Sequence, residues 1–159
     1  MSLLPFFEWC EASRIGAAIR ESLWLFPVIE AFHLVAFAVI GGTILVVDLR
    51  LLGVGDRWSP VAPLARSIQP WLLGSLAVMI PSGVLLFLSE AIKCYYSFPF
   101  WVKMWSLLLA LTFTFTIRRR MVAADAAAFA PLWRKAVGAL SIMLWSGVAW
   151  GGRWIGFSG

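Results

Sequence analysis

Four long apolar stretches follow one another along the chain, separated by short polar segments. They cover residues 23–47, 71–89, 98–117 and 136–157. At a rise of about 1.5 Å per residue, each is long enough to cross about 30 Å of hydrocarbon. The pattern therefore predicts an all-α, integral membrane four-helix bundle that forms a single transmembrane domain over residues 1–159.

The segment before the first apolar stretch has a different pattern. Between Leu3 and Arg20, apolar residues alternate with charged ones at near-helical spacing, which is typical of an amphipathic helix on a membrane surface. Glu8 and Glu11 stand where a cleavable signal would have its apolar core. We therefore expect the first apolar stretch to act as an uncleaved insertion signal. The alanine-rich residues 121–135 predict a short helical extension between the last two stretches.

Prolines mark three places where the helices should be perturbed. Pro70 is expected to open the second helix, and Pro81 lies in its middle. Pro27 lacks an N–H and would clash with the carbonyl of Leu23, so the first helix should bend or open there.

Composition and charge agree with a membrane protein. The chain is 62% hydrophobic and only 13% charged, with a mean hydropathy of +0.89, whereas soluble domains carry about 25% charged residues. The net charge of +5 comes from residues scattered over loops, so we do not expect nucleic-acid binding. The first and third connections carry most of the basic residues: Arg50, Arg57, Arg66, Arg118, Arg119, Arg120, Arg134 and Lys135. This bias predicts a bacterial inner-membrane protein with both termini in the periplasm.

Four ionisable residues lie within the apolar stretches and form the candidate site. His33 should lie near the bilayer midplane, with Glu30 one turn nearer the periplasm on the same helix face. Lys103 and Arg153 should lie at a similar depth to Glu30 on the third and fourth helices. Because such groups are costly in lipid, they should face inward and pair with one another or with a ligand.

Three interpretations of this cluster remain open. In the first, Glu30 pairs with Arg153 or Lys103, and His33 donates to a backbone carbonyl, so the cluster is structural. In the second, His33 is an axial ligand to the iron of haem b, Lys103 and Arg153 meet the propionates, and Glu30 orients the cluster. In the third, Glu30 and His33 relay protons in a small transporter.

The sixth ligand of such a haem cannot be a second histidine of this chain, because His33 is its only one. Met79, Met104, water or a residue of a partner chain could supply it. No nucleophile–base pair or multi-residue metal cluster is evident, so we do not expect the chain to catalyse a reaction alone.

Small residues and cysteines suggest further contacts. Gly147 with Gly151, and Gly152 with Gly156, form GxxxG pairs that predict a close packing face, either within the bundle or in a homo-oligomer. Asp48, followed by Arg50, is interpreted as a topological anchor at the end of the first helix, with partner docking as the alternative.

Cys10 and Cys94 both fall on the predicted periplasmic side. They would form either a disulfide or two unrelated buried thiols.

The stretch "LFPVIEAFHLVAFAVIGGTILVVDLRLLG", with "FPFWVKMWSLLLAL" and "GGRWIGF", resembles an uncharacterised family of small bacterial four-helix membrane proteins. That family is distantly similar to the cytochrome b561 and copper-resistance-D group. The resemblance covers almost the whole chain and implies a four-helix architecture. The better-known relatives bind haem b through paired histidines, whereas this chain has only His33.

These observations predict a small inner-membrane subunit of a redox or electron-transfer complex, which binds haem b through His33 and anchors a periplasmic partner or another membrane subunit. The alternatives are a non-haem structural accessory subunit and a small proton-coupled transporter.

Overall fold

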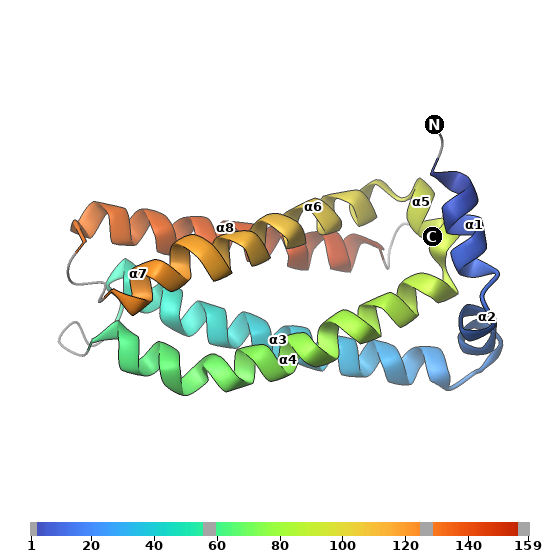
Figure 1. The fold of residues 1–159 in the computed structure, drawn as a ribbon, viewed down its shortest axis with the longest axis horizontal. Helices are drawn as coiled ribbons and strands as arrows, with labels where there is room; N and C mark the ends of the chain where they lie inside the picture. Colours follow the sequence, from blue (N-terminus) through green and yellow to red (C-terminus); the bar gives the residue numbers. More distant parts are fainter. Residues whose placement is uncertain (1–2, 56–59, 125–128, 156–159) are drawn as a thin grey trace.

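The computed structural model describes residues 3–55, 60–124 and 129–155, and every regular element in these ranges is helical. Figure 1 shows nine elements of these described ranges, with the following bounds: α1 (Leu4–Glu11), α2 (Arg14–Glu21), α3 (Leu25–Leu52), α4 (Val61–Ser89), α5 (Ala91–Tyr96), α6 (Phe98–Phe113), η1 (Thr114–Arg118), α7 (Arg119–Ala123) and α8 (Pro131–Ile155).

The long helices form two antiparallel pairs. One pair is α3 with α4, the other is α8 with the rod made of α6, η1 and α7, and α3 packs against α8 to join them (Figure 1). The short helices α1, α2 and α5 cover one end, here called the capped end. At the opposite end, here called the loop end, α3 connects to α4 and α7 connects to α8.

Helix α3 is one uninterrupted helix with a defined start and stop. Ser22 Oγ accepts hydrogen bonds from the N–H groups of Trp24 and Leu25 at 3.3 and 3.2 Å. The predicted bend at Pro27 is absent because the helix begins at Leu25, which places Pro27 in the first turn, where the N–H has no intrahelical partner in any case. Gly53, with φ of 88°, ends the helix in the left-handed conformation that glycine adopts most readily.

Helix α4 begins about nine residues before the predicted start at Pro70. Val61, Leu64 and Ile68 face the apolar cluster at the loop end, so this segment has a buried face that favours continuing the helix. Pro70 therefore lies inside α4, where it removes one backbone hydrogen bond without ending the helix.

The N-terminal segment forms two helices, not the single surface helix predicted for residues 3–20. Helix α1 ends at Glu11, and Ser13 is extended (ψ 144°) so that its hydroxyl caps α2 by accepting from Gly16 N–H at 3.1 Å. A side chain at Gly16 would collide with the carbonyl oxygen of Leu88, so glycine permits the close approach of α2 to α4.

The third long rod continues past its predicted end at Ile117. A π-helical turn, Thr114–Arg118, joins α6 to α7, and Arg118 is buried while Arg119 and Arg120 are exposed. The predicted helical extension over residues 121–135 is helical up to Ala123 and again from Pro131, where α8 begins, while 125–128 lie outside the described residues.

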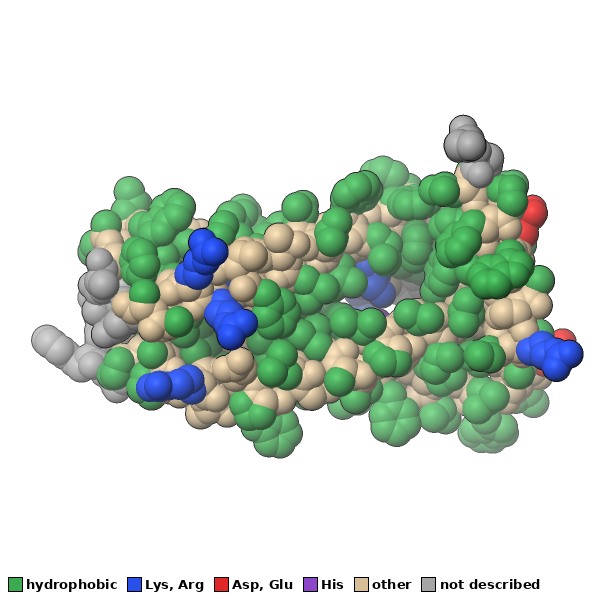
Figure 2. All heavy atoms as spheres, viewed as in Figure 1, with side chains coloured by type: hydrophobic (Ala, Val, Ile, Leu, Met, Phe, Trp, Pro, Cys, Tyr) green, Lys and Arg blue, Asp and Glu red, His purple; other side chains and the backbone are tan. Residues whose placement is uncertain are grey.

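The face of the molecule shown in Figure 2 is apolar over most of its length. Three helical stretches are long and apolar enough to cross a membrane: Leu25–Leu52, Val61–Ser89 and Phe98–Ala123. Helix α8 is 25 residues long and runs beside them. Exposed side chains such as Phe32, which is 62% exposed, are suited to contact lipid.

Candidate functional site

His33 is a residue of α3, and its side chain packs against α4. It is 9% exposed, and its Nδ1 lies 3.1 Å from the carbonyl oxygen of Met79 and 3.0 Å from Ser82 Oγ. A carbonyl only accepts hydrogen bonds, and Ser82 Oγ donates to the carbonyl of Val78 at 2.7 Å. Nδ1 therefore carries the proton, and Nε2 keeps its lone pair with no hydrogen-bond partner among the described residues.

The imidazole packs closely on a glycine of α4. A methyl group at Gly83 would lie 3.1 Å from His33 Cε1 and 3.6 Å from His33 Nδ1. This contact and the two hydrogen bonds fix the ring orientation, so the direction of Nε2 is set by the backbone of α4.

Lys103 lies on the other side of the site, where α6 packs on α8. A side chain at Gly151 would lie 3.0 Å from Lys103 Cβ, and one at Gly147 would lie 2.9 Å from Ser106 Oγ. The predicted glycine packing face is thus used within the bundle; Gly156 lies outside the described residues. Lys103 Nζ ends over Gly152, 3.6 Å from the position that a side chain there would occupy.

The space between the two helix pairs is hollowed on one face. In the described part of the chain, α4 and α6 make no extensive contact with each other, whereas α3 packs on α8 behind them. Figure 2 shows Lys or Arg atoms and histidine atoms at the floor of this hollow. A ligand entering between α4 and α6 would therefore meet these polar groups.

Two of the four predicted site residues do not join this arrangement. Glu30 is exposed on α3 and forms no ion pair within residues 3–55, 60–124 and 129–155, so the predicted pairing of Glu30 with Lys103 or Arg153 is not found. Arg153 is also exposed, on α8. Both lie near the capped end of their helices, where a long side chain can reach the membrane surface.

A second buried polar centre lies at the loop end and was not predicted. Asp48, fully buried on α3, accepts a hydrogen bond from Arg118 Nε at 2.7 Å, and Arg118 Nη2 lies 3.4 Å from the carbonyl oxygen of Ile44. Asp48 is thus an internal ion-pair partner, and its interpretation as a surface anchor was wrong. Ser141 of α8 lies near this carboxylate but outside hydrogen-bond geometry.

The sequence held one signal for this pair. Asp48 and the run Arg118–Arg120 follow directly on the first and third apolar stretches, which should end at the same membrane surface, but the π-helical turn decides which arginine points inward.

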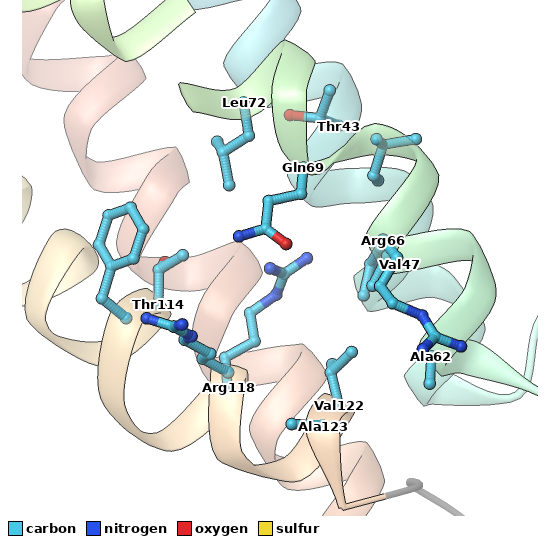
Figure 3. Close-up of a pocket in the computed structure, with 14 residues that line it drawn as sticks. Thr43, Val47, Ala62, Arg66, Gln69, Leu72, Thr114, Arg118, Val122 and Ala123 are labelled. Carbon is cyan, nitrogen blue, oxygen red and sulfur yellow. The ribbon is translucent and has the colours of Figure 1, made fainter. Parts of the chain in front are cut away.

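The cavity next to this ion pair has a volume of about 310 Å³. It lies between α3, α4 and the η1–α7 stretch, and its polar lining includes Arg66, Gln69, Arg118 and Arg119. In Figure 3 the amide of Gln69 is directed into the cavity, between α4 and the helical stretch that carries Thr114 and Arg118.

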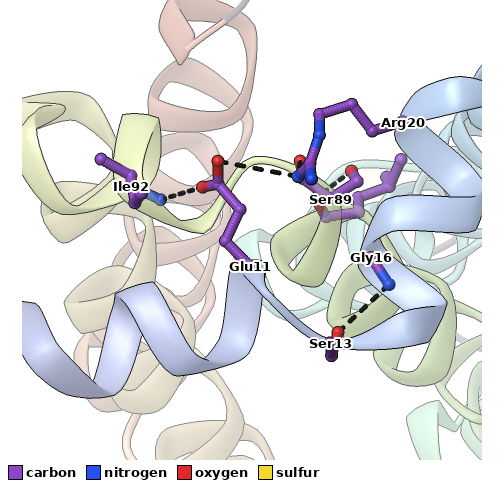
Figure 4. A network of polar contacts seen from close by, with 7 residues as sticks. Glu11, Ser13, Gly16, Arg20, Ser89 and Ile92 are labelled. Atoms are coloured by element: carbon purple, nitrogen blue, oxygen red, sulfur yellow. Dashed lines mark hydrogen bonds and ion pairs between the residues drawn. The ribbon is translucent and has the colours of Figure 1, made fainter.

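At the capped end, hydrogen bonds and an ion pair hold α1 and α2 on the bundle (Figure 4). Glu11 accepts from the N–H of Ile92 at 2.6 Å, which caps the N-terminus of α5, and lies 3.6 Å from Arg20 Nη1. Arg20 also donates to the carbonyl oxygen of Ser89 at the end of α4, at 3.1 Å. The two charges therefore satisfy helix-end groups at the α4–α5 junction.

The two cysteines are free thiols, and both are buried in one apolar cluster with Phe7 and Ala91. Of the two predicted alternatives, the disulfide is not found, and both cysteines are buried thiols. They are not unrelated, however, because both lie in the same apolar cluster. Burial is the main cause that raises the pKa of Cys94 to about 11, so this thiol is protonated at neutral pH.

No group of three or more histidine, cysteine, aspartate or glutamate side chains that could hold a metal ion occurs in the described ranges. A site of that kind is distinct from a haem site, in which the protein supplies only one or two axial ligands.

These features define an all-helical protein with three helices suited to cross a membrane, a buried ion pair at one end, and a buried histidine and a half-buried lysine nearer the other. The chain belongs to the family of unknown function DUF6644, whose profile matches residues 6–158. No curated protein and no solved structure matches it.

Proposed function

We propose that this protein is a four-helix inner-membrane subunit of a redox or electron-transfer complex in which His33 binds haem b. The observation that carries the proposal is the hydrogen bonding of the imidazole. Its Nδ1 is committed to Met79 and Ser82 of α4, which leaves Nε2 deprotonated and unbonded. This is the arrangement by which a protein orients a histidine that ligates a metal.

The charge at the site supports an anionic cofactor. Lys103 lies over Gly152 of α8, and no carboxylate forms an ion pair with it in the described ranges. A haem propionate would supply that anion. Glu30 and Arg153 are exposed, so we no longer assign them to the first contacts of the cofactor.

The surroundings of His33 also favour a flat apolar group. In the described residues α4 and α6 do not pack extensively on each other, so we propose that the group enters between these two helices. A haem bound there would supply one-electron transfer, and the residues of this chain would bind and orient the haem. Met79 is buried in the central apolar cluster and Met104 is 43% exposed, so we propose that a partner chain or water supplies the sixth ligand.

An absorption spectrum of the protein, extracted from host membranes in mild detergent so that partner subunits are retained, tests the proposal. The wild type should show a Soret band and a reduced-minus-oxidised difference spectrum, and His33→Ala should lose both. Glu30→Gln is the matched control, because it alters an exposed side chain one turn away on the same helix, and it should retain the spectrum.

Two outcomes would reject the cofactor. One is a wild-type complex that is stable but colourless, and the other is an unchanged spectrum in His33→Ala. If the colourless complex still assembles with its partners, the role is that of a structural accessory subunit, for which the hydrogen bonds between His33 and α4 would serve only to fix the two helices together.

A proton relay from Glu30 to His33 has less support. In the portion of the chain that is described, Glu30 makes no hydrogen bond, and His33 is bonded to α4. We therefore retain the redox subunit as the proposed function.

A further inference from the structure

The cavity at the loop end carries an excess of positive charge. Arg118 is neutralised by Asp48. Arg66 and Arg119, which also line the cavity, form no ion pair in the described part of the molecule, and no acidic residue is among the lining side chains. The cavity thus presents two uncompensated guanidinium groups.

Guanidinium groups recognise phosphate well because their paired N–H donors match two phosphate oxygens. The hydrogen-bonding groups beside them suit the same ligand, since Gln69 and Thr114 also line the cavity. The chemistry therefore favours a phosphate-bearing anion over a carboxylate-rich or cationic ligand.

The rest of the lining distinguishes a lipid from a free anion. Ile68, Leu72 and Phe115 line the same cavity. Leu72 lies six residues beyond Arg66 along α4, about 9 Å closer to the middle of the helix. The cavity accordingly passes from a basic part at the loop end to an apolar part deeper along the candidate membrane spans, as a phospholipid headgroup and its acyl chain require.

We infer that this cavity is a binding site for an anionic phospholipid, with Arg66 and Arg119 on the phosphate, Gln69 as an additional hydrogen-bond donor, and the acyl chain along the apolar lining formed by Ile68, Leu72 and Phe115. Basic pockets between transmembrane helices on the cytoplasmic side bind such headgroups, and the positive-inside rule predicts that side for the loop end. The site is separate from His33 and does not depend on haem binding.

Native mass spectrometry of the full chain tests this inference. The protein in neutral detergent is offered equal amounts of dioleoylphosphatidylglycerol and dioleoylphosphatidylcholine, and the ratio of bound lipids is measured. We expect the wild type to prefer phosphatidylglycerol. The double variant Arg66→Gln/Arg119→Gln should reduce that preference roughly thirtyfold, because each of the two arginines contributes about 1 kcal/mol to anionic-lipid binding.

The matched control is Arg120→Gln/Lys135→Gln. It removes the same charge from exposed positions of α7 and α8 that do not line the cavity, and it should keep the preference. An equal loss in the control would show that general surface charge attracts the lipid, and would overturn the site.

Gln69→Leu keeps both charges and should give a smaller, severalfold loss. A second arm titrates inorganic phosphate into the detergent-solubilised wild type by calorimetry. Saturable phosphate binding without a phosphatidylglycerol preference would overturn the assignment to a lipid and leave a free-anion site.

Discussion

The two polar centres of the bundle handle charge in opposite ways. At the loop end, Asp48 and Arg118 lie 2.7 Å apart, both buried, and cancel each other's charge. Nearer the capped end, neither His33 nor Lys103 forms an ion pair with a carboxylate in the described residues. The Asp48–Arg118 pair is here called the closed centre, because its two charges neutralise each other. The His33 and Lys103 region is here called the open centre, because no carboxylate is paired with it in the described residues.

The difference separates a structural site from a ligand site. A charge within a membrane is costly unless it is paired, so a closed pair needs nothing further and mainly fixes α3 against the η1 turn. An open centre holds a cation whose partner must come from elsewhere. The proposal of an anionic cofactor at His33 and Lys103 rests on this asymmetry.

Breaking the closed pair should have the largest effect on stability. Arg118→Met leaves the carboxylate of Asp48 buried without its partner, so we expect the free energy of unfolding to fall by about 3–5 kcal/mol. Denaturant unfolding in neutral detergent, followed by circular dichroism, measures this. The double variant Asp48→Leu/Arg118→Met should recover most of the loss.

Arg120→Met is the control for that experiment, because Arg120 is an exposed arginine of the same run. It should change stability by less than about 0.5 kcal/mol. A comparable loss in Arg118→Met and Arg120→Met would contradict the assignment of Arg118 to a structural pair.

The next largest effect should come from crowding the open centre. Gly83→Ala places a methyl group 3.1 Å from His33 Cε1, so the imidazole must shift and haem retention should fall severalfold, with a cost of about 1–2 kcal/mol in stability. Gly74→Ala, in the same helix with no neighbour within 4 Å, should retain haem. Equal retention in both variants would argue against His33 as the ligand.

The pattern of apolar residues predicted the helical fold because long apolar stretches have few alternatives in lipid. It misplaced the start of α4, because the buried face formed by Val61 and Leu64 outweighs the helix-breaking tendency of Pro70. It also missed the break at Ser13, whose capping hydrogen bond to Gly16 depends on a local conformation that periodicity does not reveal.

The candidate site was predicted in part. Residue type and depth singled out His33 and Lys103, because both are unusual within apolar stretches. Which face each residue occupies is decided by packing, so Glu30 was placed in the cluster although it is exposed. The Asp48–Arg118 pair joins residues 70 positions apart through a π-helical turn, a feature that no spacing rule indicates.

Removing the charge of the open centre should have the opposite sign to breaking the closed one. In protein freed of any cofactor, Lys103→Met eliminates an unpaired cation and should raise the free energy of unfolding by about 1 kcal/mol. In the haem-bound complex the same variant should weaken retention. The comparison uses matched apo and loaded samples, and a loss of stability in the apo protein would contradict the open arrangement.

The smallest expected effect concerns the buried thiol of the capped end. Burial raises the pKa of Cys94 to about 11 from the ordinary value of 9.0, so the folded protein holds the proton more tightly than the unfolded chain does. The stabilisation is therefore present at neutral pH and is lost as the pH rises from about 9 to 11. Between pH 7 and pH 9 this residue should account for a loss of about 0.4 kcal/mol. Subtracting the pH dependence of Cys94→Ala from that of the wild type isolates the contribution, and identical curves would show that the thiol is as accessible to water in the folded protein as in the unfolded chain.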